Sequence, residues 1–598
     1  MVKLCLASNG AANLPIVLTG VGNVAMQIAA KELAHFLKRI TGADFAIVGD
    51  CDGAAIRLVV DPVLAEEAFH ICCNESGLTI SGGSDRGLHY GVVGFLEDVL
   101  GVRFYTHDVT KVPKCSELAL DAIDITDAPA FEYRAIDYPL CSNAEWRVHN
   151  RINCGGSSAS QFAGCNGREM VPFGGCKAYA LYVHSFNALV NPEEYFDSHP
   201  EYFSLVNGQR LKNRTQLCLT NPEVIAIATE NAKKILRKNP GASIISISQN
   251  DCYNPCECPE CAKIDAENGS HAGSLLHFVN AVAAGIEEEF PHVVVDTLAY
   301  QYTRTPPSVI KPRHNVCVRL CSIECCFGHP MESCSHVASF ANMEKTSGST
   351  FQEDLVGWSK ICDRIYIWDY VTNYAHYLMP FPNFHVIGPN MRYFAANGVK
   401  GVFEEGNGQS VSPDMTEMRT WLLAKLLWNP NFDVEKGIYE FTESVYGDAA
   451  PEIRAYIKLF EKRVMEGNVH FGIYDFPFIG YLDPATVEEA QKIVASAQAK
   501  NLTLSQRIYV ERVALSIEYV VVAQSVLMGQ KDLDRVDALL EKARTLGVTR
   551  ISEWLDWYSF KRVFVDWDPT KPLLHNIASI ASFADVTALA DVEKVISM

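Results

Sequence analysis

The chain has 598 residues, of which 71 are acidic and 51 basic, and its formal net charge is −20 at pH 7. This balance, without a block of lysine and arginine, argues against nucleic acid or an anionic membrane as a partner. No run of about 18 apolar residues occurs and the opening MVKLCLASNG is a poor export signal, so we expect no membrane-spanning helix and a cytoplasmic location. The alternative is a secreted or periplasmic location, if a leader sequence has been trimmed.

The first part of the chain is predicted to form a small α/β domain over residues 1–125. Helical spacing of apolar residues occurs at 25–42 and 85–101, and each stretch ends in glycine, a common residue after a helix. The runs AIRLVV and GLTISGG read as strands between them. We therefore expect an accessory domain with its own sheet.

Residues 126–410 alternate short β-rich runs with helical stretches, a pattern typical of a parallel sheet covered by helices. We count eight candidate strands, the number in a closed (β/α)8 barrel. They are FEYRAIDY, AYALYVHSF, TQLCLT, ASIISIS, VVVDTLAYQY, NVCVRLCSIE, RIYIWDYV and VKGVFEE. The predicted fold class is thus α/β, with a (β/α)8 barrel as the catalytic domain. Residues 411–598 are predicted to form a helical domain.

Polar and aromatic residues follow or end most of these predicted strands. The ends of barrel strands carry the active site in this architecture. The candidate substrate-binding residues are His184, Asn250, Asp251, Tyr300, Trp368, Asp369, Tyr370 and Glu405. Acids, amides and aromatic rings that converge on one barrel opening suit a carbohydrate, because rings stack on sugar faces and planar polar groups pair with hydroxyls.

Two glutamates at separate strand ends are the groups that glycosidic cleavage requires. One carboxylic acid protonates the leaving oxygen, and one carboxylate attacks or stabilises the oxocarbenium-like centre. We predict Glu324 and Glu404 for this pair. Adjacent side chains on a strand point to opposite faces, so only one of Glu404 and Glu405 can face the site. We expect this to be Glu404, with Glu405 in a supporting or surface position.

The segment DCYNPCECPEC, residues 251–261, is the densest group among the 20 cysteines. Thiolates at this spacing can bind one zinc ion, and the candidate ligands are Cys252, Cys256, Cys258 and Cys261. A disulfide, or reduced thiols that hold a tight loop, are the alternatives. We expect no cofactor beyond this possible structural zinc.

Several stretches resemble a known family of enzymes. The stretch RGLHYGVVGFLEDVLGVRFY resembles the small domain before the barrel in α-glucuronidases and β-hexosaminidases. The middle of the chain resembles glycoside hydrolase family 163 in these stretches: HPEYFSLVNGQR, QLCLTNPEV, SISQNDCYNPCECPEC, AYQYTRTPP, RLCSIECCFGHPM, IWDYVTNYAHYLMPFPN, NGVKGVFEEGN and LLAKLLWNPNFD. They occur in the family's order across residues 20–450.

The resemblance implies an endo-acting β-N-acetylglucosaminidase that cleaves complex N-glycans with retention of configuration. Its carboxylate pair would fall on Glu324, as acid/base, and Glu404, as nucleophile. The sequence departs from the familiar FEQG form of the last motif, because it reads FEEG and adds the charge of Glu405.

Two other functions remain open. In substrate-assisted cleavage, the acetamido group of the sugar attacks and Asp251 orients it. In the second of these alternatives, the chain binds carbohydrate without catalysis. In each case the expected partner is an oligosaccharide.

Overall fold

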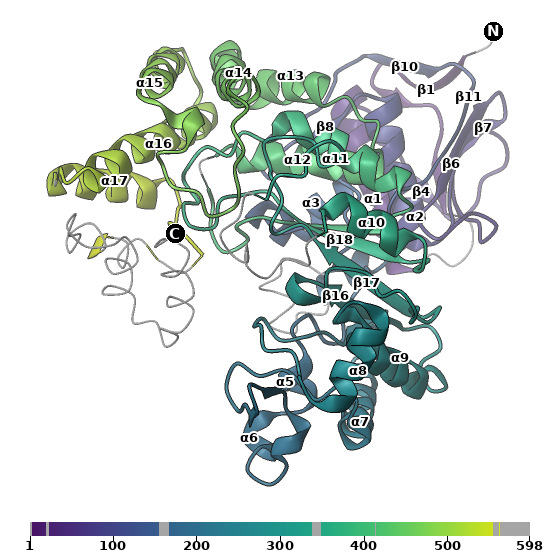
Figure 1. The fold of residues 1–598 in the computed structure, drawn as a ribbon. Helices are drawn as coiled ribbons and strands as arrows, with labels where there is room; N and C mark the ends of the chain where they lie inside the picture. Colours follow the sequence, from purple (N-terminus) through teal and green to yellow (C-terminus); the bar gives the residue numbers. More distant parts are fainter. Residues whose placement is uncertain are drawn as a thin grey trace.

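The computed structural model describes residues 3–18, 23–154, 167–337, 349–412, 414–530, 532–553, 556 and 561–562. Figure 1 shows three groups of elements: the N-terminal strands and helices at the upper right, strands β16–β18 near the centre with α5–α9 below them, and α13–α17 along the top and left.

The N-terminal part contains a six-stranded mixed sheet with two helices packed on it. The strand order is β11 (Ile123–Asp127), β6 (Phe69–Asn74), β7 (Gly77–Gly82), β5 (Ala55–Val60), β3 (Ile16–Leu18) and β4 (Ile47–Val48). A smaller sheet has the order β10 (Glu117–Leu120), β1 (Leu4–Ser8) and β2 (Ala11–Ala12).

Both helices of this part begin at residues that cap them. Helix α1 (Val24–Thr41) starts after Asn23, whose side chain accepts a hydrogen bond from the Met26 amide, and it ends at Gly42, which has a φ of 80°. Helix α2 (Asp85–Gly94) starts after Ser84, which caps the Gly87 amide. Trp428, from much later in the chain, completes the apolar core of this sheet.

The central sheet has six parallel strands and is curled. The strand order is β12 (Tyr133–Ile136), β19 (Gly401–Glu405), β18 (Ile365–Tyr370), β17 (Val316–Cys321), β16 (Val294–Ala299) and β15 (Ile244–Ser246). Helices between or after these strands are α7 (Pro222–Lys238), α8 (Pro259–Asn268), α9 (Ala272–Glu287), α10 (Phe351–Ser359), α11 (Phe384–Ala396) and α12 (Thr416–Trp428). Six of the eight predicted strands are therefore present.

The other two predicted strands do not form, so the described residues make a half-barrel sheet. The run at 178–186 lies along β15, with a bridge between Tyr179 and Ile244 and a 2.9 Å backbone hydrogen bond from the Ser246 amide to Leu181, but it forms no regular strand. The chain then turns at His184, which has a φ of 55°, and helix α5 (Phe186–Leu189) follows at once. The run at 215–220 makes a single antiparallel bridge, from Leu217 to Phe203. Apolar composition predicted regular strands at both runs, whereas each makes only irregular backbone pairing.

A buried arginine fills the concave side of the central sheet. Arg319 on β17 is fully buried, and its Nε lies 3.1 Å from Oδ2 of Asp296 on β16. The rings of Tyr133, Tyr366 and Trp368 surround its guanidinium at 5.2–5.7 Å. The ion pair and the aromatic rings offset the cost of burying this charge.

The chain then continues as packed helices: α13 (Val434–Val445), α14 (Ala450–Gly467), α15 (Pro484–Gln498), α16 (Leu504–Leu527) and α17 (Leu533–Thr545). Their apolar faces join the same core as the central sheet. None of the helices in the described ranges combines the length and apolarity that a bilayer span needs. The domain boundaries at 125 and 410 stay predictions.

Candidate active site

A pocket of about 210 Å³ opens at the carboxyl ends of the central strands. Strands β17, β18 and β19 each contribute a residue at or near their last position, as expected for a site on a parallel sheet. The lining residues are His184, Asp251, Leu298, Tyr300, Cys321, Ile323, Trp368, Tyr370, Tyr374, Glu405, Tyr474 and Glu553. Six of the predicted site residues therefore meet in one cavity.

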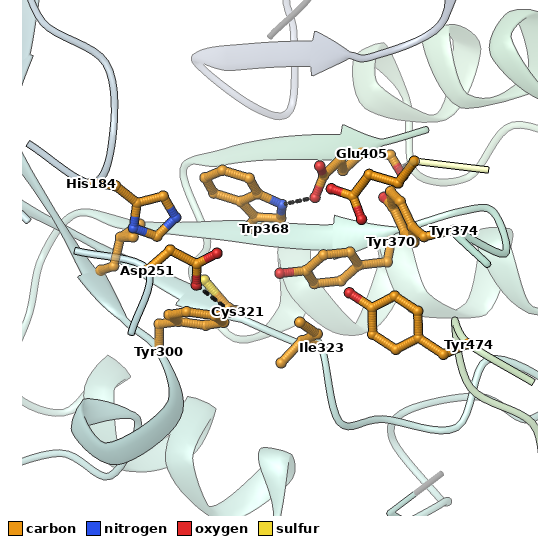
Figure 2. Close-up of a pocket in the computed structure, with 12 residues that line it drawn as sticks. His184, Asp251, Tyr300, Cys321, Ile323, Trp368, Tyr370, Tyr374, Glu405 and Tyr474 are labelled. Carbon is orange, nitrogen blue, oxygen red and sulfur yellow. Dashed lines mark hydrogen bonds between the residues drawn. The ribbon is translucent and has the colours of Figure 1, made fainter. Parts of the chain in front are cut away.

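Three carboxylates line this pocket, and they come from distant parts of the chain. Asp251 follows β15, Glu405 ends β19 and Glu553 lies beyond the last described long helix. Figure 2 shows Asp251 and Glu405 at opposite ends of the pocket, with the rings of Trp368 and Tyr370 between them. This arrangement leaves an aromatic floor flanked by acids.

Trp368 fixes the orientation of the Glu405 carboxyl group. The indole Nε1–H of Trp368 donates a hydrogen bond of 2.7 Å to Oε2 of Glu405. Burial raises the pKa of Glu405 well above its usual value, and the nearby Glu553 raises it further, whereas the Trp368 hydrogen bond lowers it. Glu405 therefore tends to keep a proton at neutral pH.

Glu553 and Asp251 complete the acidic groups of the pocket. Burial, followed by the charge of Asp251, raises the pKa of Glu553 to about 7, and Arg550 opposes this shift. Asp251 accepts a hydrogen bond of 3.2 Å from the Tyr300 hydroxyl to its Oδ1. Sequence reasoning missed Glu553 because it lies in the region that reads as helical, far from every predicted strand end.

The aromatic rings that line the pocket pack against neighbouring rings. The Trp368 ring meets Phe403 edge to face with centroids 4.8 Å apart, and Tyr370 meets Tyr374 in the same manner at 6.0 Å. Tyr474 adds a further ring from the segment after α14. These contacts hold the ring faces in place before any ligand arrives.

His184 lines the pocket in a backbone conformation that few residues adopt. Its φ is 55°, and its Nδ1 donates a 2.9 Å hydrogen bond to the carbonyl oxygen of Gln249. The unusual φ carries a conformational cost, which is typical of residues at functional sites. His184 is therefore oriented by its neighbours.

Two of the predicted substrate-binding residues lie outside the pocket lining. Asn250 is buried, and its Nδ2 donates to Oδ1 of Asn187 at 2.8 Å and to the carbonyl of Thr215 at 2.7 Å. Asp369 is buried and accepts a 2.6 Å hydrogen bond from the Ser322 hydroxyl. Both side chains support loops and strands next to the pocket.

The predicted orientation of the two adjacent glutamates is reversed. Glu405 lines the pocket, whereas Glu404 is 1% exposed and faces the other side of β19. Neither carboxyl oxygen of Glu404 has a hydrogen-bond partner among the described residues. Burial and then the nearby Asp369 raise the pKa of Glu404 well above its usual value, so Glu404 is held as a neutral acid inside the protein.

Glu324 is also buried and has a cationic partner. Its Oε2 lies 3.2 Å from Nη1 of Arg304, and Arg304 in turn donates from Nε to Oδ2 of Asp354 at 2.6 Å. Burial raises the pKa of Glu324, and Arg304 lowers it. Glu324 follows the pocket residue Ile323 but does not line the pocket itself.

A four-thiol cluster lies where the loop after β15 meets helix α8, and its membership differs from the prediction. The sulfurs of Cys218, Cys256, Cys258 and Cys261 lie within 4.8 Å of one another, and all four residues are buried. Cys218 replaces Cys252, because the Cys252 thiol points to the carbonyl of Thr215 at 3.6 Å. Sequence spacing could not reveal Cys218, which lies in the run that reads as the strand TQLCLT.

Comparison with known proteins gives one family. Residues 104–458 match the model described as Domain of unknown function (DUF4838), and this match covers more than half of the chain. The chain belongs to this family. No curated protein matches it in sequence.

Glycoside hydrolases are among the solved structures that the chain resembles. A GH115 4-O-methyl-α-glucuronidase, BtGH115A, with specificity for decorated arabinogalactans, has a TM-score of 0.58 and 14% identity, and the match covers 91% of this chain and 76% of that chain. The Flavobacterium johnsoniae chitobiase FjGH20 has a TM-score of 0.44 and 12% identity over 94% of this chain and 97% of that one. The GH115 likeness shows a shared fold. The finer resemblance to glycoside hydrolase family 163 stays a prediction.

Proposed function

We propose that the chain is a glycoside hydrolase that cleaves its substrate in the pocket of Asp251, Glu405 and Glu553. The observation that carries this proposal is the placement of Asp251 and Glu405 at opposite ends of a pocket lined by aromatic rings. Glycosidic cleavage needs two carboxyl groups on either side of the bond that breaks. The fold that the chain shares with a GH115 enzyme supports the same class.

Glu405 has the properties of the proton donor. A general acid must hold its proton at the working pH, and burial raises the pKa of Glu405 in that direction. Because Trp368 donates to Oε2, Oε1 is the oxygen left to carry the proton toward the leaving oxygen. Glu553, as a second acid nearby, strengthens proton retention.

Asp251 has the properties of the second carboxylate. The Tyr300 hydroxyl donates a hydrogen bond to its Oδ1 and so orients the carboxyl group. It can attack the sugar carbon directly, or it can orient the acetamido group of an N-acetylated sugar. Trp368 and Tyr370 supply ring faces on which the sugar packs.

The substrate that we propose is a β-linked N-acetylglucosamine unit of an N-glycan-type oligosaccharide, cleaved with retention of configuration. This part rests on the resemblance of the middle of the chain to glycoside hydrolase family 163. The pair that the sequence predicts, Glu324 and Glu404, remains the competing assignment of the catalytic carboxylates. Their burial outside the pocket lining favours Asp251 and Glu405 instead.

The test is a digest of a glycan and aryl-glycoside panel by the purified chain. Product masses identify the bond that breaks, and NMR of the first product gives its anomeric configuration. We expect sugar release from natural glycans that Glu405→Gln reduces at least 100-fold, which is within the range of general acid catalysis of about 10²–10⁴. Binding of a glycan without release of any sugar would instead support a carbohydrate-binding protein.

We also propose that the four-thiol cluster of Cys218, Cys256, Cys258 and Cys261 holds a structural zinc ion. The Sγ atoms of Cys218 and Cys258 lie 3.6 Å apart. Two sulfur ligands of one tetrahedral zinc ion, with Zn–S bonds of about 2.3 Å, would lie about 3.8 Å apart. The Leu205 amide donates to the Cys256 sulfur at 3.4 Å, a contact that would stabilise a thiolate.

A further inference from the structure

A second group of metal-ligating side chains lies apart from the four-thiol cluster. Its members are Cys326, His329, Cys334 and His470, whose ligand atoms all lie within 4.8 Å of one another. The first three lie in the segment that follows β17, with the spacing C-x2-H-x4-C. His470 lies just beyond helix α14, so the group joins two segments that are distant in the sequence.

The distances within this group are those of neighbouring ligands on one tetrahedral ion. The Cys326 sulfur lies 3.4 Å from Nδ1 of His329, and the Cys334 sulfur lies 3.6 Å from Nδ1 of His470. Zinc bonds of about 2.3 Å to sulfur and about 2.0–2.1 Å to nitrogen imply ligand separations of about 3.3–3.8 Å. Two thiols and two imidazoles are also a common ligand set of structural zinc sites.

The surroundings hold these ligands in place. The Gly328 amide donates a 3.4 Å hydrogen bond to the Cys326 sulfur, and Nε2 of His470 lies 3.3 Å from the Asn468 amide group. A ligand whose second polar atom is also engaged is typical of metal sites. Position 328 accepts only glycine, because a Cβ would lie 2.7 Å from the Phe471 ring.

We infer that Cys326, His329, Cys334 and His470 form a second structural zinc site, which fastens the segment after β17 to the segment after α14. The backbone already joins the two segments here, since the Phe327 amide donates to the carbonyl of Phe471 at 2.9 Å. The ion closes this link with four bonds from side chains.

The link has a consequence for the pocket. Ile323 lies three residues before the first ligand, and Tyr474 lies four residues after the last, and both line the pocket. The zinc therefore holds two pocket walls together without touching the reacting groups. This consequence rests on the proposed function, whereas the metal site itself does not.

Metal content tests the site without reference to activity. The purified full chain, analysed for metals, is expected to carry about two zinc ions per chain. Cys334→Ser and His470→Gln should each remove one ion, and Cys256→Ser should remove the other. His336→Gln is the matched control, because the His336 ring stacks on His470 with centroids 4.1 Å apart but does not belong to the ligand group. Two retained ions in Cys334→Ser would overturn the inference.

A second measurement needs no substitution and remains informative if a variant fails to fold. The wild-type chain is treated with a thiol-alkylating reagent before and after chelation, and the modified peptides are identified by mass. We expect chelation to increase the labelling of Cys326 and Cys334 at least tenfold, and added zinc to reverse this. Equal labelling of Cys326 and Cys334 before and after chelation, or a disulfide between these two cysteines, would overturn the inference. An inactive chain that still shows zinc-dependent protection would reject the proposed function alone.

Discussion

The indole N–H of Trp368 donates a 2.7 Å hydrogen bond to Oε2 of Glu405, so one side chain both lines the pocket and orients the carboxyl group of Glu405. The two residues lie on neighbouring strands, where the register places Trp368 beside Phe403 and Tyr370 beside Glu405. The effects of ring and hydrogen bond can therefore be separated by substitution.

Trp368→Phe should raise the pKa of Glu405, because the carboxylate loses the donor that stabilises its charge. If Glu405 acts as the acid, the alkaline limb of the kcat/KM profile should move up by about one to two pH units, as a charged hydrogen bond is worth about 1.5–3 kcal/mol. Trp368→Ala should in addition raise KM. Tyr374→Phe is the control, because the Tyr374 hydroxyl donates to the backbone carbonyl of Glu405, not to its carboxylate. An unmoved limb in Trp368→Phe would remove Glu405 from the acid role.

The dependence of rate on the leaving group separates Glu405 from Glu404. A proton donor matters for a poor leaving group and hardly at all for a nitrophenyl group, which departs unaided. Glu405→Gln should therefore lose far more kcat on a natural glycan than on a nitrophenyl glycoside. Glu404→Gln should keep kcat within a few-fold on both. The reverse result would restore Glu404 as a catalytic residue.

In the same assay, Asp251→Asn should lose rate on both substrates, because a missing nucleophile or orienting group affects every substrate. An inhibitor that mimics an oxazoline intermediate distinguishes the two roles, and strong inhibition would favour orientation of the acetamido group.

The sequence places several pocket residues at strand ends, but it does not settle which of Glu404 and Glu405 faces the pocket. Trp368, Tyr370 and Asp251 follow from their position after apolar runs, because parallel strands bring their carboxyl ends to one edge. The choice between Glu404 and Glu405 depends on the register of β19 against its neighbours, because a shift of one residue exchanges the two faces. Two consecutive acids give no hydrophobic alternation from which to settle this.

Groups that reach the site from other parts of the chain could not be predicted. Glu553 and Tyr474 belong to the region that reads as helical, and no local pattern marks them. Cys218 and His470 complete clusters whose other members lie far away in the sequence. Six of the eight predicted barrel strands form in the described residues, and at one of the other two runs the backbone turns at His184 where composition favours a strand.

The stability of the chain should depend on pH through Glu553. Its pKa rises from an ordinary 4.5 to about 7 in the folded state, so the folded chain holds a proton that the unfolded chain releases between these values. Stability therefore falls as pH rises through this window. The full loss is about 3 kcal/mol above pH 7, at about 1.4 kcal/mol per unit.

Glu553→Gln should remove this loss, because its side chain stays neutral. Urea unfolding at pH 5 and pH 8 should show the variant gaining stability over wild type mainly at pH 8. Glu466→Gln, at an exposed helix position, controls for the amide itself. An equal effect of Glu553→Gln at both pH values would contradict the raised pKa.

The Glu324–Arg304 pair should contribute to stability more than to turnover. Glu324→Gln should lower the free energy of unfolding by about 1–3 kcal/mol, since Arg304 keeps Asp354 as a partner. Arg304→Met should cost more, about 3–5 kcal/mol, because it leaves two buried carboxyl groups without their cation. Urea unfolding and kcat/KM on one glycoside measure both effects. A Glu324→Gln chain of normal stability but without activity would support the catalytic role that the sequence predicts.

The four-thiol cluster offers a direct comparison between sequence spacing and structure. Cys252 belongs to the spacing but not to the cluster, whereas Cys218 belongs to the cluster but not to the spacing. Cys218→Ser should therefore lose one zinc ion per chain and lower Tm, because a structural ion stabilises only the folded state. Cys252→Ser should keep the ion.

Zinc is measured on protein purified without chelator, and Tm is measured before and after chelation. Loss of zinc in Cys252→Ser with retention in Cys218→Ser would return the site to the ligands that the sequence predicts. Equal zinc content in both variants, with no effect of chelator on Tm, would leave the four thiols as reduced cysteines that pack the loop.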